Sequence, residues 1–297
     1  MIFQGLNQTS YDIYEDKIAS GGEGTLHRIQ GDDKHIAKIF KVDKRDAQRE
    51  EKLRFMVQHR LSEEQLKQVT WPQDVIYDKD GFAGYIMPKI EYVSSLTEIY
   101  TSNIYDLRYR VLAAVNLCAA IDTVHEMGWV CGDLNPRNIC INLNERDKDN
   151  AFKVTLVDTD SYHFTSGEKT YRCEVGQGEY IAPELQNKLG NDYDLRTVPL
   201  PSYTRETDLF ALAVHIFYLL MNGCHPFACA KDSNRKESNL PQMTGENTKE
   251  SCVAPQLVEN IQVGYFPFYE KKDGLVIPAY APEFDYLPQK IRELFIR

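Results

Sequence analysis

The change in sequence character near residue 91 most constrains how this chain can fold. Before it, three strand-like runs are separated by glycine-rich turns: Ile13–Ile18, Thr25–Gln30 and His35–Phe40. After it, apolar residues including Val111, Leu112 and Val115 recur at helical spacing from Leu107 to Met127. That spacing predicts a long buried helix. The chain as a whole is predicted to be α+β, with a small antiparallel sheet followed by a mainly helical part.

Further segments extend this pattern on both sides of residue 91. Lys44–Arg60 is rich in charged residues and places Leu53 and Met56 at helical spacing, which predicts one amphipathic helix. The remaining segments are predicted to be two strands, a buried helix and a polar surface loop: Val75–Tyr77, Gly84–Pro88, Leu209–Met221 and Ala228–Ser251.

Composition narrows the class of protein. Of 297 residues, 42% are hydrophobic and 26% are charged, which is ordinary for a folded globular protein. A net charge of −10 argues against broad nucleic-acid binding, which needs a basic face. The longest apolar run is too short to span a bilayer, the first residues lack a secretory signal, and the seven cysteines form no CxxC pair. We therefore expect a cytoplasmic protein that binds neither nucleic acid nor membrane and has no zinc site.

Two features of the strand-rich part suit phosphate binding. Gly21, Gly22 and Gly24 lie between two predicted strands, and glycine lets backbone N–H groups approach phosphates closely. A glycine-rich hairpin can equally be a simple turn. Lys38 ends an apolar strand, where it invites an anionic partner, although an edge-strand lysine facing solvent would look the same.

Two acidic motifs follow the long predicted helix. Asp133 and Asn138 lie five positions apart on one loop, which can place a base and a metal ligand on the same side. An Asx-rich turn would show the same residues. Asp158 ends the apolar strand Leu156–Val157, and its carboxylate suits a magnesium ion that bridges phosphates.

These elements, in this order, resemble the protein kinase-like superfamily over nearly the whole chain. The resemblance implies a bilobal fold that uses ATP and Mg²⁺. Residues 1–87 would form the nucleotide-binding lobe, residues 88–90 the hinge, and residues 91–297 the catalytic and substrate-binding lobe. The last residues resemble the interior of a helical region of that lobe, so we expect the lobe to be truncated at its C-terminus.

The resemblance assigns a nucleotide site in the first lobe. Gly21, Gly22 and Gly24 would cover the phosphates, with Ala19 in place of the first glycine, and Lys38 would hold the α- and β-phosphates. The residues expected around adenine are Leu26, Ile36, Met87, Lys89 and Ile90. The backbone of the hinge, from Pro88 to Ile90, would form hydrogen bonds with the adenine edge.

The resemblance also assigns the catalytic residues. Glu51, with Glu50 as the alternative, would pair with Lys38. Asp133 would accept the proton of the substrate hydroxyl, and Asn138 and Asp158 would bind the metal.

Several positions depart from the family pattern around this centre. Cys131 and Gly132 replace the His and Arg that usually precede Asp133, which disfavours activation by phosphorylation of the activation loop. Asn135 replaces a lysine that contacts the γ-phosphate, and Gln177 replaces its threonine neighbour, so we expect these two to touch. The tripeptide Asp158–Asp160 replaces the usual Asp-Phe-Gly. These departures are similar to those of an atypical group of bacterial Ser/Thr kinases, some of which carry helix-hairpin-helix segments.

Later segments bear on the substrate. Gly178–Glu184 resembles the segment that closes the activation loop, and Thr207–Ala213 resembles the helix that supports the catalytic loop. Both favour a protein substrate over a small molecule. The departures above keep a second hypothesis open, in which the chain is a pseudokinase or a nucleotide-binding interaction module.

Overall fold

The computed structural model describes residues 1–90, 94–147, 150–189, 203–232 and 257–296. The chain divides into two compact units, one made of Met1–Leu96 with Val115–Glu174 and the other of Thr97–Ala114 with Val175–Arg297. The lobe boundaries at residues 87 and 91 stay a prediction.

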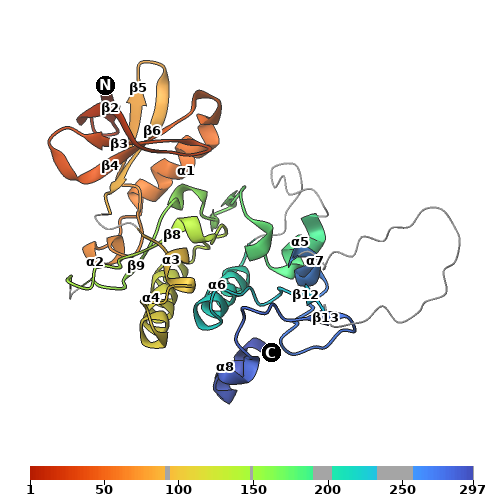
Figure 1. Cartoon of the computed structure of the whole chain (residues 1–297). Coiled ribbons are helices and arrows are strands. Elements are labelled where there is room, and N and C mark those ends of the chain that lie inside the picture. The colour runs from red at the N-terminus through yellow and green to blue at the C-terminus, as the bar shows by residue number, and fades with distance from the viewer. Residues whose placement is uncertain (91–93, 148–149, 190–202, 233–256, 297) are drawn as a thin grey trace, which may run out of the picture. The chain divides into compact units, whose positions relative to one another are not determined.

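The first unit contains an antiparallel sheet of six strands that closes on itself in the order β1-β2-β3-β4-β6-β5 (Figure 1). Its strands are β1 (Ile2–Gly5), β2 (Ser10–Ser20), β3 (Gly24–Ile29), β4 (Asp32–Phe40), β5 (Asp74–Asp78) and β6 (Gly81–Pro88). The sequence predicted five of these strands and missed β1. That strand pairs with both β2 and β5, and its Phe3 side chain joins the buried core of the sheet.

Helix α1 (Ala47–Gln58) packs against β5 and β6. Its N-terminus is capped by Asp46, whose side chain accepts a hydrogen bond from the backbone N–H of Arg49 at 2.8 Å. Leu53 and Met56 are fully buried, and the indole N–H of Trp71 donates to the Met56 carbonyl oxygen at 2.9 Å. The predicted amphipathic helix is therefore confirmed, with closer bounds.

Short elements complete the first unit. The three-stranded antiparallel sheet β7-β8-β9 positions the loop that contains Asp133, and a small hairpin follows it. The strands of these sheets are β7 (Ser94–Ser95), β8 (Ile139–Ile141), β9 (Val154–Leu156), β10 (Phe164–Ser166) and β11 (Lys169–Tyr171). Short helices between the strands of this unit are η1 (Val42–Lys44), α2 (Glu63–Leu66), η2 (Pro136–Asn138) and η3 (Thr159–Ser161).

Helix α4 (Leu107–Glu126) confirms the predicted long helix, and Val124 is buried as expected, but other apolar residues expected on its buried face lie outside it. Val111, Leu112 and Val115 are exposed by 42 to 57%. The buried face is instead formed by Ala113, Leu117, Ala120, Ile121 and Val124. Because apolar residues occupy both faces, spacing alone could not identify the buried one.

The second unit is mainly helical, with a core around Phe217. Its elements are α3 (Thr97–Tyr100), η4 (Gly178–Tyr180), α5 (Pro183–Leu189), α6 (Arg205–Leu220), β12 (Ala230–Lys231), α7 (Leu257–Gln262), β13 (Leu275–Val276), η5 (Phe284–Tyr286) and α8 (Gln289–Ile296). Strand β12 pairs with β13, so the start of the predicted loop Ala228–Ser251 is partly strand. Residues 233–251 of that loop lie outside the described residues. No described helix has the length and apolar character needed to cross a membrane.

The close approach of β6 to β4 generates a stability prediction at Gly84. A Cβ atom there would lie 1.9 Å from the backbone oxygen of Lys38, so β4 and β6 would have to separate. We expect Gly84→Ala to lower the free energy of unfolding by about 1–3 kcal/mol. Thermal or urea denaturation measures this change.

Gly22→Ala is the matched control, because a Cβ atom at Gly22 meets no atom within 4 Å. The control should denature like the wild type. Equal stability of Gly84→Ala and Gly22→Ala would contradict the strand spacing described above.

Candidate active site

The predicted nucleotide residues surround a single cavity of about 510 Å³ in the first unit. The predicted residues that line it are Gly21, Gly22, Gly24, Leu26, Ile36, Lys38, Met87, Lys89, Ile90, Asn138 and Asp158. Sequence reasoning missed Ile18, Glu23, Thr70, Arg137, Cys140 and Val157 in this lining. The structure thus brings together the glycine-rich turn, Lys38, the hinge, Asn138 and Asp158. Their roles in binding remain predictions.

The glycines of the β2–β3 turn differ in what they permit. A Cβ atom at Gly24 would lie 2.4 Å from the Ile39 backbone oxygen, so strand packing alone requires glycine there. Gly21 and Gly22 are open, with no atom closer than 3.9 Å to their added Cβ atoms. Only these two glycines leave room beside the cavity that a phosphate could use.

The ammonium group of Lys38 is buried between two carboxylates. It contacts Asp158 Oδ1 and donates to Asp160 Oδ1 at 2.7 Å, and the Tyr85 hydroxyl donates to the same Asp160 oxygen at 2.8 Å. Burial opposes the charged lysine, but the charges of Asp160 and Asp158 outweigh it and raise the pKa of Lys38. Burial works against the Asp160 carboxylate too, yet Lys38 holds its pKa below the usual range. Lys38, which projects from β4, is therefore charged, and the two carboxylates hold its ammonium group in place.

Glu51, the predicted partner of Lys38, does not reach it. Its carboxylate contacts the Lys169 ammonium and accepts from the Tyr171 hydroxyl at 3.0 Å, both from strand β11. The alternative, Glu50, accepts from Arg54 Nε at 2.9 Å and from the hydroxyl of Tyr77 at 2.8 Å. The predicted ion pair between Lys38 and a glutamate of α1 is therefore absent from the described residues, because Glu51 and Glu50 both face other partners.

The face of α1 nearest Lys38 carries cations that sequence reasoning missed. The guanidinium of Arg49 donates to both carboxylate oxygens of Glu23, at 2.9 and 3.1 Å, and lies 3.8 Å from Asp160 Oδ2. The Lys52 side chain is buried, and burial lowers its pKa to about 8. Asp160 was visible in the sequence only as a replacement for glycine, with no sign of these contacts.

The loop before β8 holds Asp133 by amide groups. Asn135 Nδ2 and Asn138 Nδ2 donate to Asp133 Oδ2 at 2.9 and 3.2 Å, and Asn138 Nδ2 also donates to the Asp133 backbone oxygen at 3.0 Å. Asp133 Oδ1 is buried and accepts no hydrogen bond from the described residues. Burial raises the pKa of Asp133, and the two amides oppose that rise. One carboxylate oxygen of Asp133 is thus fixed by two side-chain amides.

Two departures from the family pattern have a structural reason. Gly132 adopts φ 78°, a conformation that glycine takes without strain, where the family usually has Arg. Thr159, in place of the family's Phe, is buried and donates to the Thr70 backbone oxygen at 3.0 Å. Gln177 belongs to the second unit, so its expected contact with Asn135 stays a prediction.

The residues present fit a magnesium ion that arrives with phosphate. Asp158 and Asn138 line the same cavity, and Asp158 Oδ2 and Asn138 Oδ1 accept no hydrogen bond from the described residues. Asp158 is also 40% exposed, whereas Asp160 is 3% exposed. Within the described ranges, no three His, Cys, Asp or Glu residues cluster to hold a metal alone. Two protein oxygens completed by phosphate and water are a usual magnesium environment.

The hinge narrows how adenine could be read. The backbone N–H of Lys89 donates to the Lys34 oxygen at 2.8 Å, and Pro88 has no N–H. Among the N–H groups of residues 88–90, only that of Ile90 makes no hydrogen bond to the described residues and is left for adenine.

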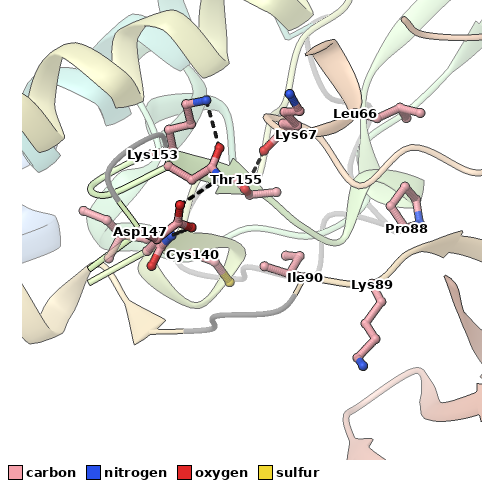
Figure 2. A pocket seen from close by; sticks show the side chains of 12 residues that line it. Leu66, Lys67, Pro88, Lys89, Ile90, Cys140, Asp147, Lys153 and Thr155 are labelled. Carbon is pink, nitrogen blue, oxygen red and sulfur yellow. Dashed lines mark hydrogen bonds between the residues drawn. The ribbon is translucent and has the colours of Figure 1, made fainter. Parts of the chain in front are cut away.

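A second cavity of about 320 Å³ adjoins the same hinge (Figure 2). Its polar groups bond mainly to one another: Lys153 Nζ donates to Asn150 Oδ1 at 3.0 Å, and the Thr155 hydroxyl donates to the Lys67 backbone oxygen at 2.7 Å. This pairing distinguishes it from the first cavity, where Asp158 and Asn138 keep oxygens available.

The sequence of residues 14–265 matches the protein kinase domain family, so the chain belongs to that family. Its fold is the α+β bilobal fold of protein kinases.

Relatives include Protein kinase YegI of Escherichia coli (strain K12), which is 30% identical over 226 residues. That match covers 71% of this chain and 32% of YegI, so the chain spans about a third of that protein. MAP kinase-interacting serine/threonine-protein kinase 1 of Xenopus tropicalis is 27% identical over 196 residues, covering 63% of this chain and 42% of the relative.

The amide contacts of Asp133 predict a pH effect. Asn135→Ala removes a donor that favours the Asp133 carboxylate, so the pKa of Asp133 should rise further. The acid limb of kcat/KM, which reports the free enzyme, should then move to higher pH. A pH–rate profile with peptide substrate measures the shift.

Asn142→Ala is the matched control, because Asn142 Nδ2 donates to Asp147 Oδ2 at 3.0 Å away from Asp133. Its profile should follow the wild type. An acid limb of Asn135→Ala that stays in place or moves to lower pH would rule out this role of the amide.

Proposed function

We propose that the chain is an ATP- and magnesium-dependent protein kinase that transfers the γ-phosphate to Ser or Thr hydroxyls of a protein substrate. The observation that carries this proposal is the grouping of Lys38, Asn138 and Asp158 around one cavity, on the same loop system as Asp133. A purely structural role would not require this combination of charges. The relatives' names, which include serine/threonine-protein kinases, support the acceptor class.

Each residue has a distinct part in the proposed reaction. Lys38, held by Asp160, offers its ammonium to the phosphates, while Gly21 and Gly22 leave space above them. Asp133, held by the amides of Asn135 and Asn138, orients the substrate hydroxyl and accepts its proton. Bound magnesium would neutralise phosphate charge and orient the γ-phosphate, held by Asp158 and Asn138.

A second candidate function, a pseudokinase or nucleotide-binding interaction module, is favoured by one observation. Asn135 directs its amide to Asp133 instead of offering a cation toward the γ-phosphate position. Charge stabilisation of the transition state would then be weaker than in kinases that have lysine at this position. The two candidates differ in phosphate transfer and agree in binding Mg-ATP.

Three substitutions test the assigned roles. Lys38→Ala, Asp133→Asn and Asp158→Asn should each abolish transfer, but only the first and third should weaken Mg-ATP binding by roughly tenfold or more, because Asp133 handles the hydroxyl. Transfer is measured with labelled ATP and mass spectrometry, and affinity by displacement of a fluorescent nucleotide.

The wild type and Asp133→Asn form the decisive pair. Phosphate incorporation by the wild type alone supports the kinase, whereas incorporation in both samples reveals a contaminating kinase. Mg-ATP binding without incorporation supports the second candidate, and equal affinity in all three variants would refute the site.

A further inference from the structure

Helix α1 presents no carboxylate to Lys38. Its inward positions are occupied by Arg49, which is 18% exposed, and by the buried Lys52, Leu53 and Met56, at the i, i+3, i+4 and i+7 spacing of one helix face. Two of these four are cations. A third cation, the buried Lys38, therefore needs a counter-charge from another element, since an unpaired buried charge is costly.

Asp160 supplies that counter-charge, mainly through its Oδ1 atom. Oδ1 accepts from Lys38 at 2.7 Å and from the Tyr85 hydroxyl at 2.8 Å, while Oδ2 lies 3.8 Å from Arg49 Nη1. The side chain is 3% exposed, so water cannot replace these partners.

Asp158 differs from Asp160 in its hydrogen-bond partners and in its exposure. It shares only Oδ1 with Lys38, and its side chain is 40% exposed at the cavity that Lys38 also lines. A carboxylate with a spare, accessible oxygen can turn to a metal ion. A buried carboxylate such as Asp160 cannot do so without breaking its contacts with Lys38 and Tyr85.

We propose that Asp160 is the positioning residue for the phosphate-binding ammonium of Lys38, in the place where a glutamate of helix α1 was expected. The inference rests on the proposed function, because it names the support of that same site. The two carboxylates of the Asp158–Asp160 segment thus have different roles. Asp158 can leave Lys38 for a metal, and Asp160 keeps Lys38 in place when it does.

Both glutamates of α1, Glu51 and Glu50, are bound to other partners, so the position of Lys38 does not depend on either of them turning inward. Lys38, Tyr85 and Asp160 come from β4, β6 and the segment after β9, which fixes the ammonium from elements other than α1.

The experiment compares Asp160→Asn with Glu51→Gln, the competing variant, by the same conservative change. We expect Asp160→Asn to weaken Mg-ATP binding by about tenfold or more, and Glu51→Gln to change it by less than about threefold. In a Lys38→Ala background, Asp160→Asn should add little further loss, because its effect acts through Lys38.

A second readout needs no nucleotide. Acetylation of Lys38 by acetic anhydride, followed by mass spectrometry, reports how firmly its side chain is held away from the reagent. Loss of the contact between Asp160 and Lys38 should free the side chain and increase the acetylation rate, and Glu51→Gln should leave the rate unchanged.

Asp74→Asn is the matched control for loss of a buried carboxylate. Like Asp160, Asp74 is a buried carboxylate that accepts a hydrogen bond from a tyrosine hydroxyl. Its partner is Tyr11, at 2.9 Å, and Asp74 is 8% exposed. It should affect thermal stability without changing Mg-ATP affinity or Lys38 acetylation.

The outcomes separate this inference from the proposed function. If the wild type binds Mg-ATP but transfers no phosphate, the proposed kinase activity is refuted. The affinities and acetylation rates then still test whether Asp160 positions Lys38. Loss of affinity or faster acetylation in Glu51→Gln, with Asp160→Asn like the wild type, would overturn the inference. Should Asp160→Asn not fold, Glu51→Gln decides alone: unchanged acetylation supports the inference and faster acetylation overturns it.

Discussion

The candidate site depends on keeping one lysine charged inside the protein. Lys38 projects from β4 into a region that water barely reaches, so its charge exists there only because two carboxylates accept it. Those carboxylates come from a segment 120 and 122 residues away. The pairing therefore connects the closed sheet to the segment after β9. Arg49 continues the network to Glu23 in the glycine-rich turn. Sheet, helix and turn are thus joined by charge as well as by apolar packing.

The fold was predictable wherever the pattern was local. The alternation of β2 to β6 and the charged helix α1 were visible in short windows of sequence. Strand β1 was missed because it is four residues long and one of its partners, β5, lies some 70 residues away. The buried face of α4 was misassigned because Val111 and Val115 are apolar without being covered. In both cases a distant neighbour decides the outcome, and no local window contains that neighbour.

The site shows the same limit. Asp133, Asn138 and Asp158 follow fixed spacings within their own motifs, and the structure places the last two at one cavity with Lys38. The partner of Lys38 depends instead on the rotation of α1, and the hairpin of β10 and β11 draws Glu51 to the other side. A motif fixes which residues share a loop. It does not fix which of two carboxylates a buried cation will meet.

Gly24 has an implication for how such motifs are compared between proteins. Its missing side chain is demanded by the Ile39 backbone oxygen, which lies 2.4 Å from where a Cβ atom would be. A descendant that had lost every trace of nucleotide chemistry would still be under selection to keep this glycine, because the sheet would not close well without it. Conservation of Gly24 in a lineage would therefore reflect the close packing of β3 against β4 and would not be evidence of nucleotide binding. Gly22, with open space around it, is the position at which relaxed selection would first become visible.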